Sequence, residues 1–147
     1  MFDALRLFPR RLRELIATVP PERLRTRAAD GGFAFIEHAW HLADLEVEGY
    51  GVRIRRILEE DEPELADFRG DAIAEERQYL ELELAPALQR FAEARAANVA
   101  MLESARDRAD RGGMQEGVGR VTLARVAEMM AEHDAGHASE LHALRDS

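Results

Sequence analysis

The chain has 147 residues, no cysteine and no lysine, and it carries 20 arginines against 29 acidic residues for a formal net charge of −9. The lack of cysteine excludes disulfides, zinc fingers, iron–sulfur clusters and thiol nucleophiles, and the lack of lysine excludes Schiff-base and P-loop chemistry. The acidic balance argues against nucleic acid and anionic membranes as partners, because both bind through basic side chains. The length favours one domain, residues 1–147.

No apolar run approaches the ~20 residues of a membrane span or the uncharged core of a signal peptide. Residues 1–27 hold seven arginines, but they also hold three acids and no serine, which favours a structural helix over a transit peptide. We therefore expect a soluble protein, with a cytoplasmic location as the default.

Apolar residues recur at three- and four-residue spacings along four stretches of the chain, and no stretch alternates like a strand for long. The predicted fold class is therefore all-α. Amphipathic helices of this length bury their apolar faces most simply in a four-helix bundle, where ligand and metal sites lie between facing helices. The expected helices cover about residues 2–18, 33–60, 72–108 and 122 to near the C-terminus.

Proline, glycine and a capping threonine set the predicted helix ends. The first helix ends at Pro20-Pro21, the second ends before Pro63, and Thr122 is the expected N-cap of the last. Pro86 either begins the main part of the third helix or kinks it. The glycine-rich segment Gly112–Gly119 lacks the lysine and the preceding strand of a phosphate-binding loop, so we expect a mobile connector.

Two histidines of the last helix point toward the predicted core. At about 100° per residue, His133 and His137 fall inside the apolar arc formed by Val126, Met130 and Leu141. A buried imidazole needs partners for both ring nitrogens, and the helix backbone cannot supply them. Histidines at i and i+4 can instead converge on one ion, with metal–nitrogen bonds of ~2.0–2.1 Å for zinc. The alternative is a pair of partly exposed side chains that hydrogen-bond to acids.

The second helix offers a third histidine on a polar stripe that lies between two apolar sectors. This pattern favours a polar cavity inside the bundle, with His41 presented toward the last helix. Asp44 and Glu37 are then candidates to accept a hydrogen bond from a ligand histidine and fix its tautomer. His38 lies about 60° further round and is expected to be packed or exposed, and His142 is expected at the surface. The stripe consists of Glu37, His41, Asp44, Glu48 and Arg55.

Two segments carry a pattern known from a protein family. The first, IEHAWHLADLE (Ile36–Glu46), is similar to a helix with the motif E-x-x-x-H-L-x-D-x-E, and the second, VTL (Val121–Leu123) with MAEHDAGH (Met130–His137), is similar to a helix with T-L followed by H-D-x-x-H. In this order and spacing they resemble the DinB/YfiT-like superfamily of small metal-binding helical bundles. Where that family commonly begins the first of these helices with Trp-Ser, this chain has Phe33-Ala34, which predicts a shifted helix start.

The resemblance implies a four-helix bundle with a non-sequential helix arrangement, often dimeric, that holds one divalent ion, typically zinc or nickel, on three histidines. Carried over position by position, the ligands are His41, His133 and His137. It further implies an enzyme acting on a small molecule, foremost a transferase or isomerase that uses a low-molecular-weight thiol such as bacillithiol or mycothiol. We accordingly expect a homodimer.

Other residues offer less chemistry than this metal site. Arg95, on the apolar side of the third helix, is a candidate for holding an anionic substrate, while an internal ion pair with Glu37 or Glu48 is the alternative. The few serines lack a nucleophile-elbow context, so the metal would carry any reaction. Three neutral imidazoles leave an open position on the ion, which suits thiol transfer or hydrolysis. The other alternative is a bundle that binds a metal or ligand without catalysis.

Overall fold

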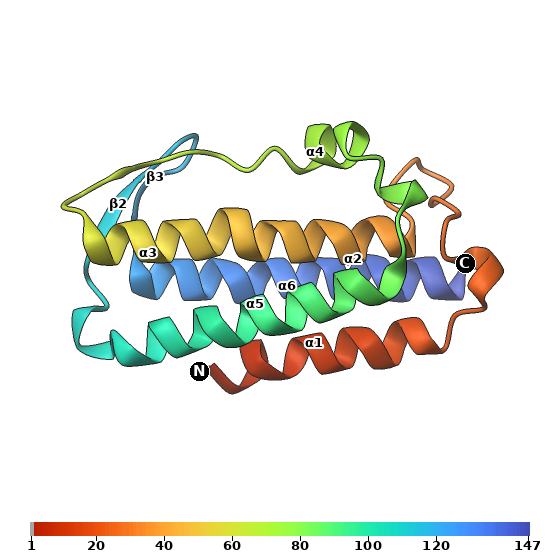
Figure 1. The fold of residues 1–147 in the computed structure, drawn as a ribbon, viewed down its shortest axis with the longest axis horizontal. Coiled ribbons are helices and arrows are strands. Elements are labelled where there is room, and N and C mark those ends of the chain that lie inside the picture. The colour runs from red at the N-terminus through yellow and green to blue at the C-terminus, as the bar shows by residue number, and fades with distance from the viewer. Residues whose placement is uncertain (1) are drawn as a thin grey trace.

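A computed structural model of the chain describes residues 2–147, and its long helices lie side by side (Figure 1). Each helix carries an apolar stripe, and the helices bury these stripes against one another as a four-helix bundle. The helices are α1 (Phe2–Ala17), α2 (Phe35–Asp44), α3 (Gly51–Glu59), α4 (Gly70–Glu76), α5 (Leu84–Ser104) and α6 (Leu123–Asp146). Short 3₁₀ turns cover Pro21–Arg23, Tyr79–Glu81 and Arg106–Arg108.

The order of the helices around the bundle differs from their order in the chain. Both α1 and α2 pack against α5 and α6, which places α1 diagonally opposite α2. The continuous rod of α2 and α3 runs in the same direction as α5 (Figure 1). This is possible because residues 60–83, which we call the crossover, pass back along the rod before α5 begins. The crossover carries α4, which lies against α2.

The second predicted helix, residues 33–60, contains an irregular turn. A π-helical turn over Leu45–Tyr50 separates α2 from α3. Gly51 donates its backbone N–H to the carbonyl of Glu46, five residues earlier, and Asn98 of α5 donates to the same carbonyl at 2.9 Å. A π turn holds more residues than an α turn, so it changes which residues after it face the core. Predictions from α-helical periodicity alone miss this change.

The third predicted helix, residues 72–108, is two helices in the structure. Gln78 adopts a left-handed backbone conformation with φ of 51°, which ends the helical run of α4. The chain then turns before α5 begins at Leu84. Pro86 lies in the first turn of α5, where a backbone N–H would have no helical partner, so this proline begins the helix and does not kink it.

The glycine-rich segment predicted to be a mobile connector is a β-hairpin. Strand β2 (Gly112–Gln115) pairs antiparallel with β3 (Gly119–Thr122), and β1 (Glu64–Leu65) of the crossover pairs parallel with β2. Gly117 and Gly119 have φ values of 77° and 109°, a region that glycine adopts without strain. The glycines therefore serve the tight turn of the hairpin.

The core consists of two apolar clusters. One is built around Ile54 and Val99, and the other around Phe35 and Phe91. Along α5, Arg95 lies between Phe91 and Val99 and is fully buried. A layer of polar side chains therefore crosses the middle of the bundle.

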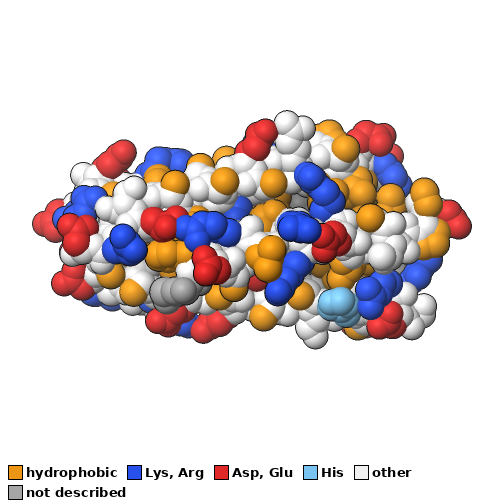
Figure 2. Space-filling model, turned by 90° about the horizontal axis from the view of Figure 1, so that it is seen from below, with side chains coloured by type: hydrophobic (Ala, Val, Ile, Leu, Met, Phe, Trp, Pro, Cys, Tyr) orange, Lys and Arg blue, Asp and Glu red, His pale blue; other side chains and the backbone are white. Residues whose placement is uncertain are grey.

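The outer surface mixes charges of both signs. Seen from the side of α1 (Figure 2), arginine and acidic side chains are interspersed with hydrophobic ones. Among residues 2–147, no helix combines the length and the apolar character needed to cross a membrane.

Candidate metal centre

The two helices that carry the histidines begin at well-defined caps. Thr122 caps α6 as predicted, because its hydroxyl accepts the backbone N–H of Arg125 at 3.0 Å. α2 begins with Ala34 as N-cap, which has no side-chain acceptor, and the carboxylate of Glu37 accepts the Ala34 N–H at 3.0 Å, as the third helical residue does in a capping box. Glu37 also binds the guanidinium of Arg27 through both carboxylate oxygens. Its role is therefore to start α2, and the predicted bond from Glu37 to a ligand histidine is not formed.

His41 of α2 meets His133 and His137 of α6 inside the bundle. The Nε2 of His133 lies 3.4 Å from Nε2 of His41 and 3.1 Å from Nε2 of His137. His41 and His137 are buried, with 8% and 9% of their surfaces exposed, and His133 is half-buried. The three ring nitrogens therefore converge at the edge of the core.

This convergence fits a divalent ion better than it fits hydrogen bonding. Each ring nitrogen offers one hydrogen or one lone pair in the ring plane, so Nε2 of His133 makes a good hydrogen bond with only one of its two neighbours. A tetrahedral ion with nitrogen ligands at ~2.0–2.1 Å holds those nitrogens ~3.3–3.4 Å apart. The ligand atoms of the three residues all lie within 4.8 Å of one another. Their spacing is thus suitable for metal ligands.

Burial keeps the three imidazoles neutral. It lowers the pKa of His41 to about 3, that of His133 to about 4 and that of His137 to about 2, from an ordinary value of 6.5. Positive charge on His133 lowers the pKa values of His41 and His137 further. The positive charges of Arg95 and Arg53 lower the pKa of His133. Because neutral imidazole is the form that binds a metal, the lone pairs are available at neutral pH.

His38, expected to be packed or exposed, is buried and forms part of the site. Its Nδ1 lies 2.8 Å from Nδ1 of His137, and its Nε2 lies 3.7 Å from a carboxylate oxygen of Glu140. The ligand atoms of these three residues also fall within 4.8 Å of one another, but 2.8 Å is a hydrogen-bond distance, so we assign a hydrogen bond between the rings. When Nε2 of His137 offers its lone pair, Nδ1 carries the hydrogen and donates it to His38.

Sequence reasoning missed this role of His38. The available signal was its position three residues before His41, which places the two rings on neighbouring parts of one helix face. In the structure the ring of His41 contacts His133, and the ring of His38 hydrogen-bonds to His137.

The crossover closes over the ring of His41. The Nδ1 atom of His41 is buried and has no hydrogen-bond partner among residues 2–147. A Cβ at Gly70, the first residue of α4, would lie 2.6 Å from Cε1 and 2.8 Å from Nδ1 of this ring. The ring centroid of Phe68 lies 6.0 Å from that of His41. Only glycine fits at position 70 without moving the imidazole.

Asp44 binds arginines and a tyrosine, and the predicted bond from Asp44 to a ligand histidine is not formed. Its carboxylate accepts hydrogen bonds from Arg77 at 2.9 Å, from the hydroxyl of Tyr79 at 2.6 Å and from Arg90 at 3.1 Å. Arg77 also binds both carboxylate oxygens of Glu48. The polar stripe of α2 was expected to line a cavity, but at Asp44 and Glu48 it packs against the crossover instead. Asp44 therefore anchors the end of the crossover to α2.

Arg95 is not free to hold a substrate. Its guanidinium donates two hydrogen bonds to Glu46 at 3.0 Å, two to Asp134 at 2.7 and 2.8 Å, and one to the carbonyl of Leu5 at 3.0 Å. That carbonyl lacks a helical donor because Pro9, four residues later, has no N–H. A guanidinium has five N–H donors, and all are used here. Arg95 is therefore a structural residue, held by acids other than those predicted, and not the predicted anion-binding residue.

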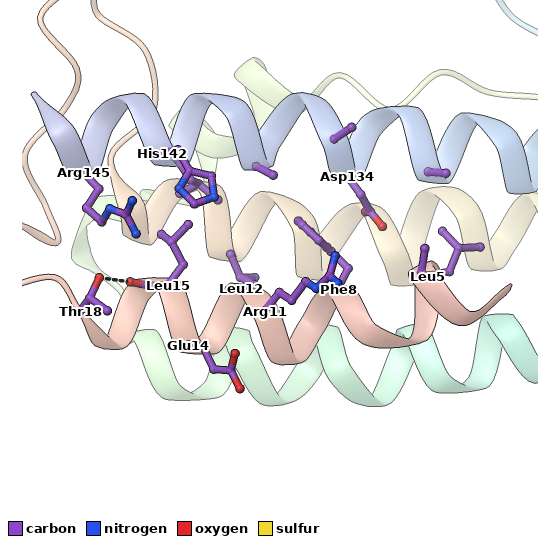
Figure 3. Close-up of a pocket in the computed structure, with 15 residues that line it drawn as sticks. Leu5, Phe8, Arg11, Leu12, Glu14, Leu15, Thr18, Asp134, His142 and Arg145 are labelled. Carbon is purple, nitrogen blue, oxygen red and sulfur yellow. Dashed lines mark hydrogen bonds between the residues drawn. The ribbon is translucent and has the colours of Figure 1, made fainter. Parts of the chain in front are cut away.

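A separate groove with a volume of about 540 Å³ runs between α1 and α6 (Figure 3). Phe8 and Leu12 of α1 contribute to its apolar wall, and His142 and Arg145 of α6 lie near its end. His142 is exposed, as expected. None of the three clustered histidines lines this groove, so it is not part of the candidate metal centre.

Comparison with known proteins agrees with this architecture. The chain is similar in structure to YfiT from Bacillus subtilis, with a TM-score of 0.89 and 21% sequence identity, over 97% of this chain and 82% of that chain. YfiT is described as a probable metal-dependent hydrolase with an unusual four-helix bundle topology, and the present chain shares that topology. No curated protein matches the chain. A sequence model of the DinB superfamily matches residues 4–141, and the chain therefore belongs to the DinB superfamily.

Proposed function

We propose that this protein is a metal-dependent enzyme that acts on a small molecule, with His41, His133 and His137 holding one divalent ion. The convergence of three neutral Nε2 atoms at 3.1 and 3.4 Å is the observation that supports this proposal most directly. Hydrogen bonding cannot satisfy all three nitrogens, whereas one ion can accept all three lone pairs. Zinc and nickel are the metals we expect.

The chemistry follows from the donor set. Three neutral histidines would leave the charge of the ion uncompensated and a position open, and the ion would then supply acidification of a water or thiol near neutral pH. The chain itself has no cysteine, so the reactive sulfur or oxygen must come from outside the protein. The three histidines would hold the ion, burial keeps their rings neutral, and His38 orients His137.

Hydrolysis is the reaction we place first. It is supported by the description of YfiT, whose fold this chain shares. Thiol transfer is the second candidate, because a chain without cysteine would need a thiol co-substrate to supply nucleophilic sulfur. A bundle that binds a metal without catalysis would keep no exchangeable position on the ion.

Metal titration tests the proposal directly. Protein purified without a nickel column and stripped with a chelator should bind one zinc or nickel ion per chain in calorimetry. His133→Ala should lose this binding, and His142→Ala, an exposed histidine of the same helix, should retain it. Full binding by His133→Ala would refute the ligand set.

The cobalt-substituted protein then separates the reaction classes. Its visible spectrum should change when a small anion or a thiol enters the open position, and an unresponsive spectrum would favour a purely structural ion. A response to thiols together with turnover of electrophiles would favour transfer over hydrolysis. A panel of esters and amides provides the matching assay for hydrolysis.

A further inference from the structure

Arg53 is a buried arginine without a counter-ion. Only 6% of its surface is exposed, and its Nε is buried with no hydrogen-bond partner. Among residues 2–147 it forms no ion pair within 4.0 Å and donates no hydrogen bond. Arg95, by contrast, is more deeply buried, with 1% of its surface exposed, and donates to two carboxylates. The Nη1 and Nη2 atoms of Arg53 are not among the fully buried atoms, so the unpaired end of the guanidinium reaches solvent, from which a negatively charged partner can bind it.

The π turn brings Arg53 to the side of α2 that carries the triad. On a regular helix, a residue twelve positions after His41 would lie about 120° away from it around the axis. The extra residue in the turn Leu45–Tyr50 reduces this angle by about 100°, so His41 and Arg53 lie on nearly the same face of the helix. Irregular turns of this kind often occur at functional sites because they redirect side chains.

Arg53 and His133 share Tyr50 as a neighbour. The Cζ of Arg53 lies 5.5 Å from the ring centroid of Tyr50, and the Tyr50 ring lies 6.2 Å from the ring of His133. The guanidinium and a candidate metal ligand therefore both lie beside the same buried aromatic ring. Burial, chiefly, and then the charges of Arg95 and Arg53 lower the pKa of His133 to about 4, which agrees with this placement.

Asp67 of the crossover is the carboxylate whose charge acts against the lowering of the Arg53 pKa by burial. Asp67 is exposed and its carboxylate lies more than 4.0 Å from the guanidinium, so it does not form an ion pair with Arg53. A single guanidinium balances a single negative charge, and its planar fork matches the two oxygens of a carboxylate. These features favour a carboxylate over a doubly charged phosphate.

We propose that Arg53 binds a carboxylate group of the substrate, next to the three-histidine centre where the reacting group lies. This proposal rests on the proposed function, since the triad defines which end of the substrate reacts. The substrate class is thus a small carboxylic acid with its reactive bond a short distance from the carboxylate. Arg53 binds and orients this molecule and takes no part in bond making.

The test uses the metal-free protein, so that binding is measured without turnover. Acetate, benzoate and succinate serve as probes, their amides serve as uncharged controls, and inorganic phosphate serves as the other anion. Calorimetry gives the dissociation constant in every variant, and the NMR signal of the Arg53 Nε–H group locates the bound anion in the proteins that keep Arg53. We expect a saturable shift with at least one carboxylate, none with the corresponding amide, and a dissociation constant at least tenfold higher in Arg53→Met. Arg55→Met, an exposed neighbour on the same helix, should bind like the wild type.

Stability gives a second readout. Arg53→Met removes an unpaired buried charge and keeps the volume, so it should melt at a higher temperature than the wild type without ligand, while Arg55→Met should melt at the same temperature. Carboxylate affinity unchanged in Arg53→Met, or phosphate binding tighter than every carboxylate, would overturn the proposal.

Zinc titration of the same variants keeps the two proposals apart. Arg53→Met should still bind one zinc ion, because it leaves the triad intact. Stoichiometric zinc with no carboxylate binding would refute the role of Arg53 alone. Carboxylate binding that depends on Arg53, in a protein that binds no zinc, would refute the metal centre alone.

Discussion

The Nδ1 atoms of His38 and His137 lie 2.8 Å apart in the interior of the bundle. One of the two nitrogens must carry a hydrogen and the other a lone pair for this distance to be favourable. The Nε2 of His38 faces Glu140 at 3.7 Å, which favours a hydrogen on that nitrogen and a lone pair on its Nδ1. His137 is therefore the donor, and its Nε2 is left with the lone pair that points toward His133.

Removal of His38 should weaken metal binding without removing a ligand. His38→Ala is expected to raise the dissociation constant for zinc by roughly 10–100-fold, because His137 loses the bond that fixes its tautomer. His38→Asn, whose amide lies near the position of Nδ1, should restore part of the affinity. Competition with a chromogenic chelator measures both constants, and His142→Ala is the control. Wild-type affinity in His38→Ala would contradict the assigned role.

A methyl group at position 70 should displace a ligand. In Gly70→Ala the new Cβ would lie 2.6 Å from Cε1 of His41, so the ring must move and zinc affinity should fall. Gly136→Ala is the matched control, since a Cβ there meets nothing within 4 Å. Gly136→Ala should instead raise the free energy of unfolding by about 1 kcal/mol through helix propensity. Unchanged zinc affinity in Gly70→Ala would show that the crossover does not press on the ring.

Loss of Arg95 should destabilise the whole bundle. Arg95→Ala leaves Glu46 and Asp134 buried without their cation, which is expected to cost about 3–5 kcal/mol of unfolding free energy in urea denaturation. Arg125→Ala breaks exposed ion pairs with Glu128 and Glu132 and should change stability little. A similar small effect for both variants would contradict the structural role of Arg95.

Acid should destabilise the metal-free protein through its buried histidines. Burial lowers the pKa of His38 to about 4 and that of His41 to about 3, whereas the unfolded chain binds these protons near the ordinary value of 6.5. The unfolded state therefore takes up more protons as the pH falls below 6.5, and the folded state loses stability. Stability should be full above that pH and fall continuously toward pH 4.

Urea denaturation at about pH 7.5, 6.0 and 5.0 measures this dependence. Carboxylates held by arginine, such as Glu60, start from an ordinary pKa of 4.5 and add their effect only at lower pH. His133→Leu should flatten the dependence, and His142→Ala should leave it unchanged. A stability that does not vary between pH 7.5 and pH 5 would show that the rings are not buried as neutral groups.

Periodicity predicted the bundle and the inward direction of three histidines, because regular α-helical spacing holds throughout α6 and along α2 up to Asp44. It failed after that point, where the π turn of Leu45–Tyr50 changes the spacing and brings Arg53 to the side of the triad. No local sequence rule marks such a turn. The glycines of the hairpin were likewise ambiguous, since they suit a tight turn as well as a mobile segment.

The ion-pair partners of buried side chains were the second feature that the sequence did not predict. Asp44, Glu37 and Arg95 were correctly placed near the core, but their partners come from the crossover, from the segment before α2 and from α6. Which acid meets which arginine depends on the helix order around the bundle, and pattern reasoning does not give that order. The metal, the thiol, the homodimer and the cytoplasmic location stay predictions.

The triad joins positions 92 residues apart, on α2 and α6. An ion bound there would close a loop that contains the crossover, α5 and the hairpin. Closing so long a loop costs chain entropy, and the packing of α6 against α2 has already offset that cost when the ion binds. Nascent chains that still lack the last helix would consequently have no metal affinity at this position. Ion uptake would thus report that α6 has been synthesised and has packed against α2.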